Sequence, residues 1–432
     1  MDGSYCVDRD VGSGVVADNI LWILTDDQMR STLPTMDRTW KRLAEKGVRF
    51  PRGYAAMPWC GPARASILSG RYAHDHGCST NMTHPSFVAQ GLDQDTVATR
   101  MSAAGYDTGY FGKYMNGHNQ DPTYAAPGWD RWVTLVDGDR TMNVDETVRV
   151  LDTQREVETF SADRLQRFVR RHRDTGPWFA VWAPATPHDP YTPGPEHAHD
   201  FDGVAWDPPA FNEVDLADKP SWLRDLPPQD RAQMRRIYEG KLEELRDLDD
   251  QVGRVLDLLW RTGQLGRTWV FFVSDNGYLL GEHRLFKKEQ PYEESVGVPF
   301  VVRGPGVSPA VPDALVSQVD LMPTTLAVAG LDPDAGRELD GRSMLDPLLS
   351  GDWSRWRRRL LVENTNLGWA MLREDSTSYV EHHDRGEWEL YDLDDDPHQL
   401  ASRVDADVRD WSARLSLLRQ TRGAALRALE EG

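Results

Sequence analysis

The sequence predicts an α/β fold: one large, mainly parallel β-sheet flanked by helices, followed by a smaller C-terminal antiparallel sheet with a helix. Short, nearly all-apolar runs recur along most of the chain, and helical patterns separate them. Such an alternation is typical of a parallel sheet that helices cover on both faces. Beyond about residue 350 the apolar runs lie closer together and are joined by turns. This change predicts the second, antiparallel sheet.

Four apolar runs are the strand candidates of the large sheet: 19–24, 106–111, 178–183 and 269–273. Each is short enough for a strand and lacks the polar alternation of a half-exposed one, so we expect both faces to be buried. Polar or charged residues follow each run. In chain order they are Asp26 and Asp27, then Gly112 and Lys113, then His188, then Asp275 and Asn276.

Helices are predicted between these strands. Apolar residues recur at spacings of three and four over 238–259, which indicates one face of an amphipathic helix. Residues 36–47 are predicted as another helix, with Gly47 as its C-cap. Residues 189–235 are rich in proline and aspartate and are expected to form surface loops with short helices, and residues 1–18 a loose leader.

A domain boundary is predicted near residue 350, where Pro347, Gly351 and several arginines interrupt the pattern. A large domain over 19–350 would then carry the chemistry, and 351–432 would form a small α+β subdomain. Its strands are expected at 360–363, 369–373, 378–382 and 388–393, with a turn at 384–386. A closing helix is expected from about 404 to 429.

The composition excludes several classes of protein. The 432 residues are 39% hydrophobic, which is too apolar for a disordered chain, and the net charge of −20 argues against nucleic-acid binding. No apolar run approaches the roughly 18 residues of a membrane span. The three cysteines, Cys6, Cys60 and Cys78, do not form a disulfide framework. No signal peptide is visible, so we expect a cytoplasmic protein, or a secreted one if an export signal was removed.

Asp26, Asp27, Asp275 and Asn276 are predicted to bind a metal ion. All four directly follow apolar strands, and ligands of open α/β sheets bind at the carboxyl ends of the strands. Oxygen ligands suit a hard cation, Ca²⁺ or Mg²⁺. Either pair alone is more simply explained as a helix cap or a turn. The occurrence of both pairs at strand ends favours the metal.

The segment Pro58–Arg71 is the second candidate. Pro62 suits the first turn of a helix, so Cys60 would lie at the helix N-terminus, where the dipole favours an anion. Arg64, one turn later, can face the same side. A nucleophile beside free N–H groups and a guanidinium suits an oxyanion substrate. The alternative is a buried structural cysteine.

Basic residues complete the candidates. A histidine or lysine could bind a sulfate oxygen or protonate a leaving group, although each alone is more often simply solvated. These residues are Lys113, His118, His188, His283, Lys287 and Lys288.

These motifs together resemble the type I sulfatases, a branch of the alkaline phosphatase superfamily. The match consists of Cys60-x-Pro62-x-Arg64 with Leu68-Ser69-Gly70-Arg71, at the family's distance after Asp26-Asp27. Gly112-Lys113, Asp275-Asn276-Gly277 and the segment 389–397 follow in the family's order. The resemblance covers roughly residues 19–400. It implies an alkaline phosphatase-like fold and the hydrolysis of an organic sulfate ester to an alcohol and sulfate.

The resemblance also implies a mechanism. In this family a separate formylglycine-generating enzyme oxidises the motif cysteine, here Cys60, to formylglycine. One hydroxyl of the hydrated aldehyde, activated by the metal, would attack sulfur and expel the alcohol. The second hydroxyl would then lose its proton and eject sulfate, which restores the aldehyde. An oxygen nucleophile also suits a hard cation better than a thiolate does.

Roles are carried over by position. Asp26, Asp27, Asp275 and Asn276 would bind Ca²⁺, with Mg²⁺ possible, and modified Cys60 would be a further ligand. Arg64 and Lys113 would steady the formylglycine hydroxylate. His188 and Lys288 would bind the sulfate, and one of them would protonate the leaving oxygen. Lys288 is preferred to Lys287 because the family lysine stands four residues before a Tyr-Glu pair, here Tyr292-Glu293. His283 is a candidate contact on the substrate side.

One position departs from the family pattern. Many members have a histidine two residues after the motif lysine, and Met115 stands there in this chain. That histidine deprotonates the second hydroxyl, so His118 or Asn116 is expected to replace it. The string 112–118 is similar to the glucosamine-6-sulfatase branch, which implies a carbohydrate sulfate as substrate.

Three other functions remain open from the sequence. A phosphonate monoester or phosphodiester hydrolase could use the same scaffold, because these esters share the tetrahedral anionic geometry of sulfate. A cysteine hydrolase could use unmodified Cys60 with His188 as base. A binding protein could hold sulfated ligands without cleaving them.

Overall fold

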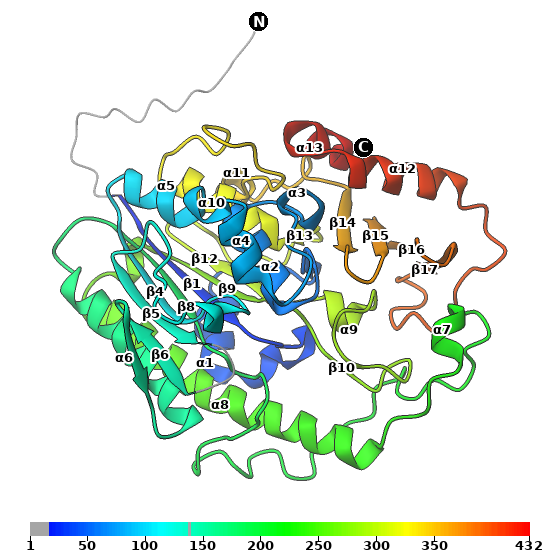
Figure 1. The fold of residues 1–432 in the computed structure, drawn as a ribbon, viewed down its shortest axis with the longest axis horizontal. Coiled ribbons are helices and arrows are strands. Elements are labelled where there is room, and N and C mark those ends of the chain that lie inside the picture. Colours follow the sequence, from blue (N-terminus) through cyan, green and yellow to red (C-terminus); the bar gives the residue numbers. More distant parts are fainter. Residues whose placement is uncertain (1–16, 137–139) are drawn as a thin grey trace, which may run out of the picture.

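The computed structural model describes residues 17–136 and 140–432, and its centre is a nine-stranded sheet (Figure 1). In spatial order the strands are β2 (Val48–Arg49), β12 (Phe300–Arg303), β9 (Thr268–Ser274), β1 (Asn19–Thr25), β8 (Trp178–Ala183), β4 (Asp107–Lys113), β5 (Arg131–Val136), β6 (Thr141–Val144) and β7 (Thr147–Val150). The five strands from β9 to β5 are parallel, and the strands outside them pair antiparallel. The predicted mainly parallel sheet is therefore confirmed.

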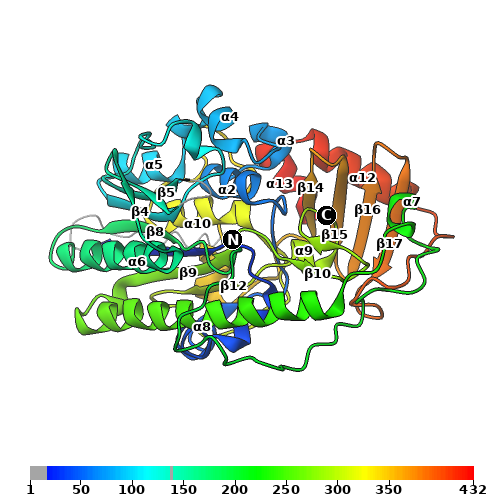
Figure 2. The ribbon, with the colours of Figure 1, turned by 60° about the horizontal axis from the view of Figure 1, so that its bottom comes forward.

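Helices cover both faces of this sheet, which explains the continuous apolar runs. Leu21 and Ile23 of β1 pack into one core with α6 (Gln154–Arg171) and α8 (Arg231–Arg261). Ile20 and Trp22 point to the opposite core, which contains side chains of α2 (Cys60–Ser69), α5 (Val97–Ala103) and α10 (Leu321–Val328). Figure 2 shows α8 and α6 on one side of the strands and α2 and α10 on the other. Neither face of β1 meets water, so no polar alternation is needed.

The predicted helix at 36–47 is wrong in its details. The chain forms a 3₁₀ helix η1 (Arg30–Thr35), a short α1 (Asp37–Thr39) and a π-helical turn η2 (Trp40–Ala44). Gly47 is no left-handed C-cap, because its φ lies outside the positive range. A Cβ at Gly47 would lie 2.3 Å from the carbonyl oxygen of Val302. Glycine is therefore required there for the close approach of β12.

The second sheet is antiparallel, as predicted, with strands β14 (Arg359–Asn364), β15 (Trp369–Glu374), β16 (Thr377–His382) and β17 (Glu387–Asp392). The single closing helix is wrong: α12 (Arg409–Gln420) and α13 (Gly423–Glu431) are separate. Thr421 and Arg422 are extended between them. Leu361 and Leu372 of this sheet share a core with Tyr72 and Val319, so the second sheet packs against these earlier segments of the chain. The boundary at residue 350 stays a prediction.

The remaining elements are short. They are β3 (Gly53–Tyr54), α3 (Ala73–His76), α4 (Thr83–Ala89), η3 (Leu92–Gln94), η4 (His118–Gln120), α7 (Ser221–Arg224), η5 (Leu265–Arg267), β10 (Leu279–Leu280), β11 (Phe286–Lys287), α9 (Glu293–Val296), β13 (Val316–Ser317), η6 (Gln318–Asp320) and α11 (Leu345–Ser350). Residues 189–235 are mostly loops, as expected. Cys6 and most of the predicted leader at 1–18 lie outside the described residues, which begin at 17.

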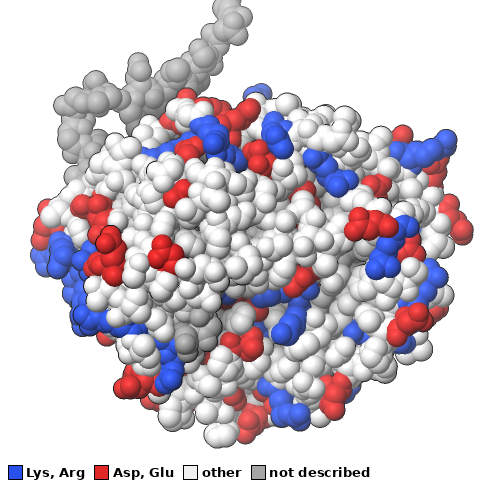
Figure 3. Space-filling model, in the orientation of Figure 1, with Lys and Arg blue, Asp and Glu red and all other residues white. Residues whose placement is uncertain are grey.

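The surface is mixed in charge. Figure 3 shows acidic and basic side chains interspersed over most of the visible face, with several basic ones grouped at its lower left edge. In the described part of the chain, no helix combines the length and the apolar character that crossing a bilayer requires.

Candidate active site

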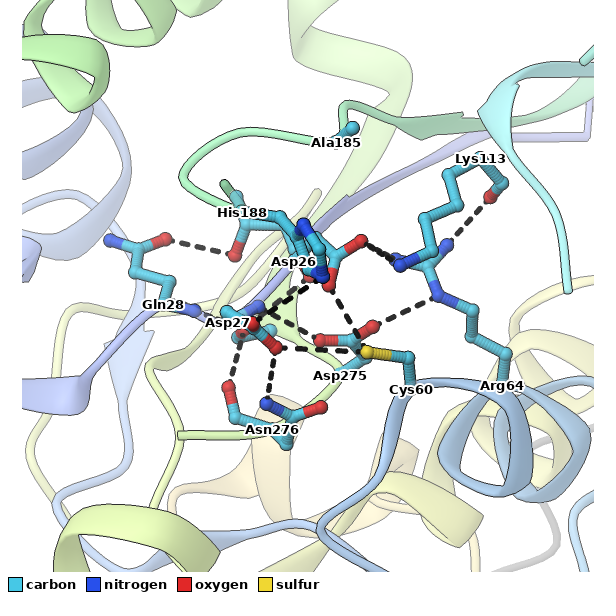
Figure 4. A network of polar contacts seen from close by, with 12 residues as sticks. Asp26, Asp27, Gln28, Cys60, Arg64, Lys113, Ala185, His188, Asp275 and Asn276 are labelled. Atoms are coloured by element: carbon cyan, nitrogen blue, oxygen red, sulfur yellow. Dashed lines mark hydrogen bonds and ion pairs between the residues drawn. The ribbon is translucent and has the colours of Figure 1, made fainter. Parts of the chain in front are cut away.

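The two predicted pairs of polar residues meet at the carboxyl edge of the large sheet. Strands β1 and β9 are parallel neighbours, with Thr25 opposite Ser274, so the residues that follow them emerge side by side. The Asp275 N–H donates to the carbonyl of Thr25 at 3.0 Å. The Asp27 N–H donates to Oδ1 of Asp275 at 3.1 Å. Figure 4 shows these side chains around one centre, with Cys60 opposite them.

Four potential ligand atoms are crowded at this centre. Atoms of Asp26, Asp27, Cys60 and Asp275 all lie within 4.8 Å of one another, and each of these residues is at most 1% exposed. Carboxylates that close together without water repel each other strongly. A hard cation relieves this repulsion and prefers oxygen ligands. The donor set therefore fits Ca²⁺ or Mg²⁺.

The amide of Asn276 supports the same conclusion. Its Oδ1 is buried and has no hydrogen-bond partner among the described residues, while its Nδ2 donates to Oδ1 of Asp27 at 2.7 Å. An amide oxygen and nitrogen exchange places by a simple flip. Flipped, the oxygen of Asn276 would face the carboxylate of Asp27, an arrangement that a cation between them stabilises.

Cys60 begins helix α2, as predicted. It is the first helical residue after Trp59, and Pro62 lies in the first turn, where its missing N–H costs nothing. Its Sγ lies 3.4 Å from Oδ1 of Asp26 and 3.7 Å from Oδ1 of Asp27. Burial, and then the charge of Asp26, raises the pKa of the Cys60 thiol well above its ordinary value. A nucleophilic thiolate needs the opposite shift, so the arrangement disfavours a cysteine hydrolase.

Three cations surround the acidic cluster. The Nε of Arg64 donates to Oδ2 of Asp275 at 2.9 Å, and its Nη1 donates to the carbonyl of Lys113 at 2.6 Å. The Lys113 ammonium donates to Asp26, and that of Lys288 donates to Asp27. Burial alone would raise the pKa of Asp26, but Lys113 and its other cationic neighbours hold that pKa well below the ordinary value. Asp26 is therefore ionised, as a metal ligand must be.

Lys288 is placed differently from its neighbour Lys287. The Nζ of Lys288 lies 2.7 Å from Sγ of Cys60, and the residue is buried. Lys287 is exposed on strand β11. Of these two lysines, the structure brings Lys288 to the centre.

His188 lies at the open edge of the centre, on the loop that follows β8. Its Nε2 is 3.8 Å from Oδ2 of Asp27, and one third of its side chain is exposed. Together with Asp26, Lys113 and Asn116 it lines a hollow of about 370 Å³. A substrate in this hollow could therefore contact both His188 and Asp26.

The structure does not bring His118 or His283 to this centre. His118 is buried among aromatic rings, 6.0 Å from that of Trp132, and its Nε2 is 3.2 Å from the carbonyl of Tyr124. His283 contacts Glu213 at 2.6 Å and stacks on Tyr292. Neither histidine lines the hollow beside His188. We therefore assign neither of them a role at the reacting group.

Sequence reasoning missed Lys241 of helix α8. It is completely buried, and its Nζ donates to the carbonyls of Pro187 and Asp27 at 2.8 and 3.2 Å. Burial lowers the pKa of Lys241 to about 8, although Asp27 opposes the shift. The sequence does contain a sign of this role. Lys241 lies four residues before Leu245 on the apolar face of the helix, where a charged residue is unexpected.

Two glutamates, the half-buried Glu158 and the buried Glu244, bind the backbone of the loop that carries His188. Glu158 accepts from the Ala185 N–H at 2.9 Å, and Glu244 accepts from the Thr192 N–H at 2.7 Å. Burial raises the pKa of Glu158 to about 7 and that of Glu244 to about 8. Carboxyls with raised pKa values stabilise the fold fully below their unfolded pKa and lose this contribution as the pH rises through the folded value.

The free energy of unfolding of the wild type should fall between pH 5 and 9 as Glu244 ionises. We therefore expect Glu244→Gln to remove much of this fall. Glutamine keeps the acceptor for Thr192 and cannot ionise, so at pH 9 the variant should be more stable than wild type by about 1–3 kcal/mol. At pH 5 the two should be equal. Urea unfolding at both pH values measures this, with the exposed Glu45→Gln as control. An equal pH dependence in wild type and Glu244→Gln would contradict it.

Comparisons with known proteins identify the family of this chain. A family profile described as Sulfatase matches residues 18–331, and one described as N-sulphoglucosamine sulphohydrolase, C-terminal, matches 281–417. The chain is 32% identical to the extracellular sulfatase SULF-1 homologue of Drosophila melanogaster over 80% of this chain and 33% of that protein. It is 29% identical to human N-acetylglucosamine-6-sulfatase over 82% and 68%. This chain thus spans only a third of the fly relative's length.

Solved structures share the fold. One, in complex with its substrate D-glucosamine-2-N,6-O-disulfate, has a TM-score of 0.75 at 22% identity, with 94% of this chain and 97% of that one covered. The phosphonate monoester hydrolase of Agrobacterium radiobacter has a TM-score of 0.71 at 22% identity, with 92% and 93% covered. The fold is therefore common to both kinds of enzyme. Since the Sulfatase profile covers most of the chain, this protein belongs to the sulfatase family.

Proposed function

We propose that the protein hydrolyses an organic sulfate ester to an alcohol and inorganic sulfate at the centre around Cys60. The convergence of three buried carboxylates, Asp26, Asp27 and Asp275, on the Cys60 sulfur carries the proposal. These groups come from two strands and a helix that lie far apart in the sequence. The pairing of β1 with β9 brings the three carboxylates together, and the N-terminus of α2 adds Cys60 to them.

The centre as proposed has two further components. A divalent cation, Ca²⁺ or Mg²⁺, held by Asp26, Asp27, Asp275, Asn276 and residue 60, would supply Lewis acidity to oxygen atoms bound there. Formylglycine made from Cys60 would supply an oxygen nucleophile. An oxygen nucleophile suits the proposed cation better than a thiolate does.

The basic residues divide the remaining tasks. Arg64 is held rigidly by Asp275 and the Lys113 carbonyl, so its position in relation to residue 60 is fixed. Lys113 and Lys288, both buried, bind negative charge that develops on oxygen. His188 protonates the leaving alcohol. We choose His188 over Lys288 because His188 lines the open hollow through which the alcohol would depart, whereas Lys288 does not line that hollow.

A carbohydrate sulfate is the proposed substrate class. The structural relative named above was solved with a disulfated glucosamine, and the human relative is named for a 6-sulfated amino sugar. A second hollow of about 440 Å³ is lined by Trp222, Gln290, Asp384 and Arg385. Gln290 lies two residues after Lys288 in the chain. Aromatic and hydrogen-bonding side chains of this kind suit a sugar.

The proposal includes maturation by a formylglycine-generating enzyme. Mass spectrometry of the peptide that contains Cys60 tests this directly: active protein should carry the aldehyde instead of the thiol. A cytoplasmic location stays a prediction. Secretion is the alternative that the fly relative's description as extracellular supports.

The function is tested with a panel of substrates. Aryl sulfate and glucosamine 6-sulfate should be hydrolysed, and EDTA should remove the activity until Ca²⁺ or Mg²⁺ is returned. An aryl phosphonate monoester and a phosphodiester are the comparison substrates. A kcat/KM higher for either of them than for every sulfate would refute the sulfatase proposal in favour of the sister activity. Tight binding of sulfated sugars without turnover would show a binding protein.

Lys288 and Lys287 offer a matched pair of variants. Lys288→Ala should lower kcat by about 10²–10³-fold, because a buried charge aimed at the reacting group is removed. Lys287→Ala, one residue away and exposed, should leave kcat within about twofold. Steady-state kinetics with aryl sulfate measures both. Similar losses in the two variants would show that the segment, and not the Lys288 ammonium, matters.

A further inference from the structure

Lys241 extends from the long helix α8 to the edge of the sheet that carries the candidate active site. Figure 2 shows this helix crossing beneath the strands. The Lys241 ammonium donates to the carbonyl of Pro187 at 2.8 Å and to that of Asp27 at 3.2 Å, and it lies 3.8 Å from the centre of the Tyr278 ring. Among the described residues it forms no ion pair with a carboxylate. Its charge is therefore directed at two backbone carbonyls and an aromatic face.

The Asp27 carbonyl belongs to a residue in an unfavourable backbone conformation. Asp27 has a φ of +63°, in the left-handed region, which costs a non-glycine residue about 1 kcal/mol. Such a conformation persists only when its surroundings hold it. With it, the Asp27 carboxylate points to the Cys60 centre while the carbonyl points to Lys241. The charge-assisted hydrogen bond from Lys241 supplies part of that support.

The other carbonyl, that of Pro187, directly precedes His188 in the chain. Pro187 and His188 share a peptide unit, so a fixed Pro187 carbonyl also fixes the backbone from which the imidazole projects. His188 Nε2 lies 3.8 Å from Asp27 Oδ2. One ammonium thus bonds to the Asp27 carbonyl and to the peptide unit that Pro187 shares with His188. A buried lysine without a carboxylate partner costs stability, so packing alone does not explain its presence on an apolar stripe.

We propose that Lys241 is a positioning residue, whose ammonium holds the carbonyls of Asp27 and Pro187 and thereby fixes the Asp27 carboxylate in relation to His188. This rests on the proposed function in so far as Asp27 is a metal ligand and His188 acts on the substrate. Groups behind metal ligands typically affect metal affinity or activity by about 10–100-fold. Lys241 contacts neither the substrate hollow nor the Cys60 sulfur.

The test compares Lys241→Met with a matched buried lysine. Methionine keeps the volume and removes the donors. We expect kcat for aryl sulfate to fall about 10–100-fold with KM within about threefold, and Ca²⁺ affinity, measured by isothermal titration calorimetry, to fall about tenfold. Lys219→Met is the control, because Lys219 is also fully buried, donates to the Leu400 carbonyl and lies over the Tyr391 ring. Unlike Lys241, it also pairs with the carboxylates of Glu213 and Asp218. It should lower the unfolding temperature and leave kcat and Ca²⁺ affinity unchanged.

The outcomes separate the two proposals. Wild-type protein that binds Ca²⁺ but hydrolyses no ester would refute the proposed function, and the Ca²⁺ affinities of the variants would still decide the role of Lys241. Lys241→Met with wild-type kcat and wild-type Ca²⁺ affinity would overturn the positioning role. So would equal losses of affinity in Lys241→Met and Lys219→Met, or a wild-type chain that binds no divalent cation.

Discussion

Cys60→Ala is expected to abolish the hydrolysis of sulfate esters, with kcat lowered by at least about 10⁴-fold. Alanine offers no atom that can be oxidised to an aldehyde, so the nucleophile is lost completely. The carboxylates around position 60 remain, and so does the hollow beside His188. Substrate and cation can therefore still bind to the variant. Cys60→Ser should lose nearly all activity as well, because the maturation step acts on cysteine.

Cys78 provides the matched control for this experiment. It is the other free cysteine in the described part of the chain, and it is equally buried. Its Sγ lies 3.8 Å from the hydroxyl of Ser86 and it takes no part in the acidic centre. Cys78→Ala should keep its kcat within about twofold. Activity retained by Cys60→Ala, in protein whose mass excludes contaminating wild type, would refute the proposed nucleophile.

The positions of the carboxylates could be predicted from the sequence for a physical reason. Strands β1 and β9 are buried on both faces, so their apolar runs are continuous and their ends are sharply marked by Asp26 and Asp275. Parallel strands end at one edge, so residues after them converge. The sequence alone did not reveal that β1 and β9 are direct neighbours. The order of the motifs, known from the family resemblance, supported that step.

The prediction for His118 failed because distance along the chain does not fix direction. His118 follows Lys113 by only five residues, but Gly117 has a φ of +88° and the chain turns there. The turn places His118 in the ring cluster of Tyr114 and Trp132. Lys241 is the opposite case. It is more than 200 residues from Asp27 in sequence, and only the packing of α8 under the sheet brings them together.

The interruption between helices α12 and α13 near Thr421 could not be predicted from the spacing of apolar residues. Apolar residues keep a helical spacing through 404–429, so periodicity predicts one helix. The structure begins a second helix at Gly423, which has a φ of +58°. A Cβ there would lie 1.9 Å from the Glu338 side chain. A contact with a residue 85 positions earlier decides the boundary, and no local pattern contains it.

Asp275→Asn is expected to remove divalent-cation binding and to lower kcat by at least about 10³-fold. Asparagine keeps the size of the side chain, but one of three charges that attract the cation disappears. The Nε of Arg64 also loses its carboxylate partner. Ca²⁺ at 100 times its Kd should stabilise the wild type against unfolding by about 2.7 kcal/mol, and it should stabilise Asp275→Asn by almost nothing.

A buried aspartate away from the centre is the control for this last variant. Asp249 of α8 accepts hydrogen bonds from the Arg38 and Thr39 backbone N–H groups and from the Thr39 hydroxyl. Asp249→Asn should lower stability in the absence of metal, yet keep the full Ca²⁺-dependent gain and the wild-type kcat. Thermal unfolding with and without Ca²⁺ separates the two variants. An unchanged Ca²⁺-dependent gain in Asp275→Asn would mean that the carboxylates meet at Cys60 for some purpose other than binding a cation. The proposed mechanism would then lose its Lewis acid.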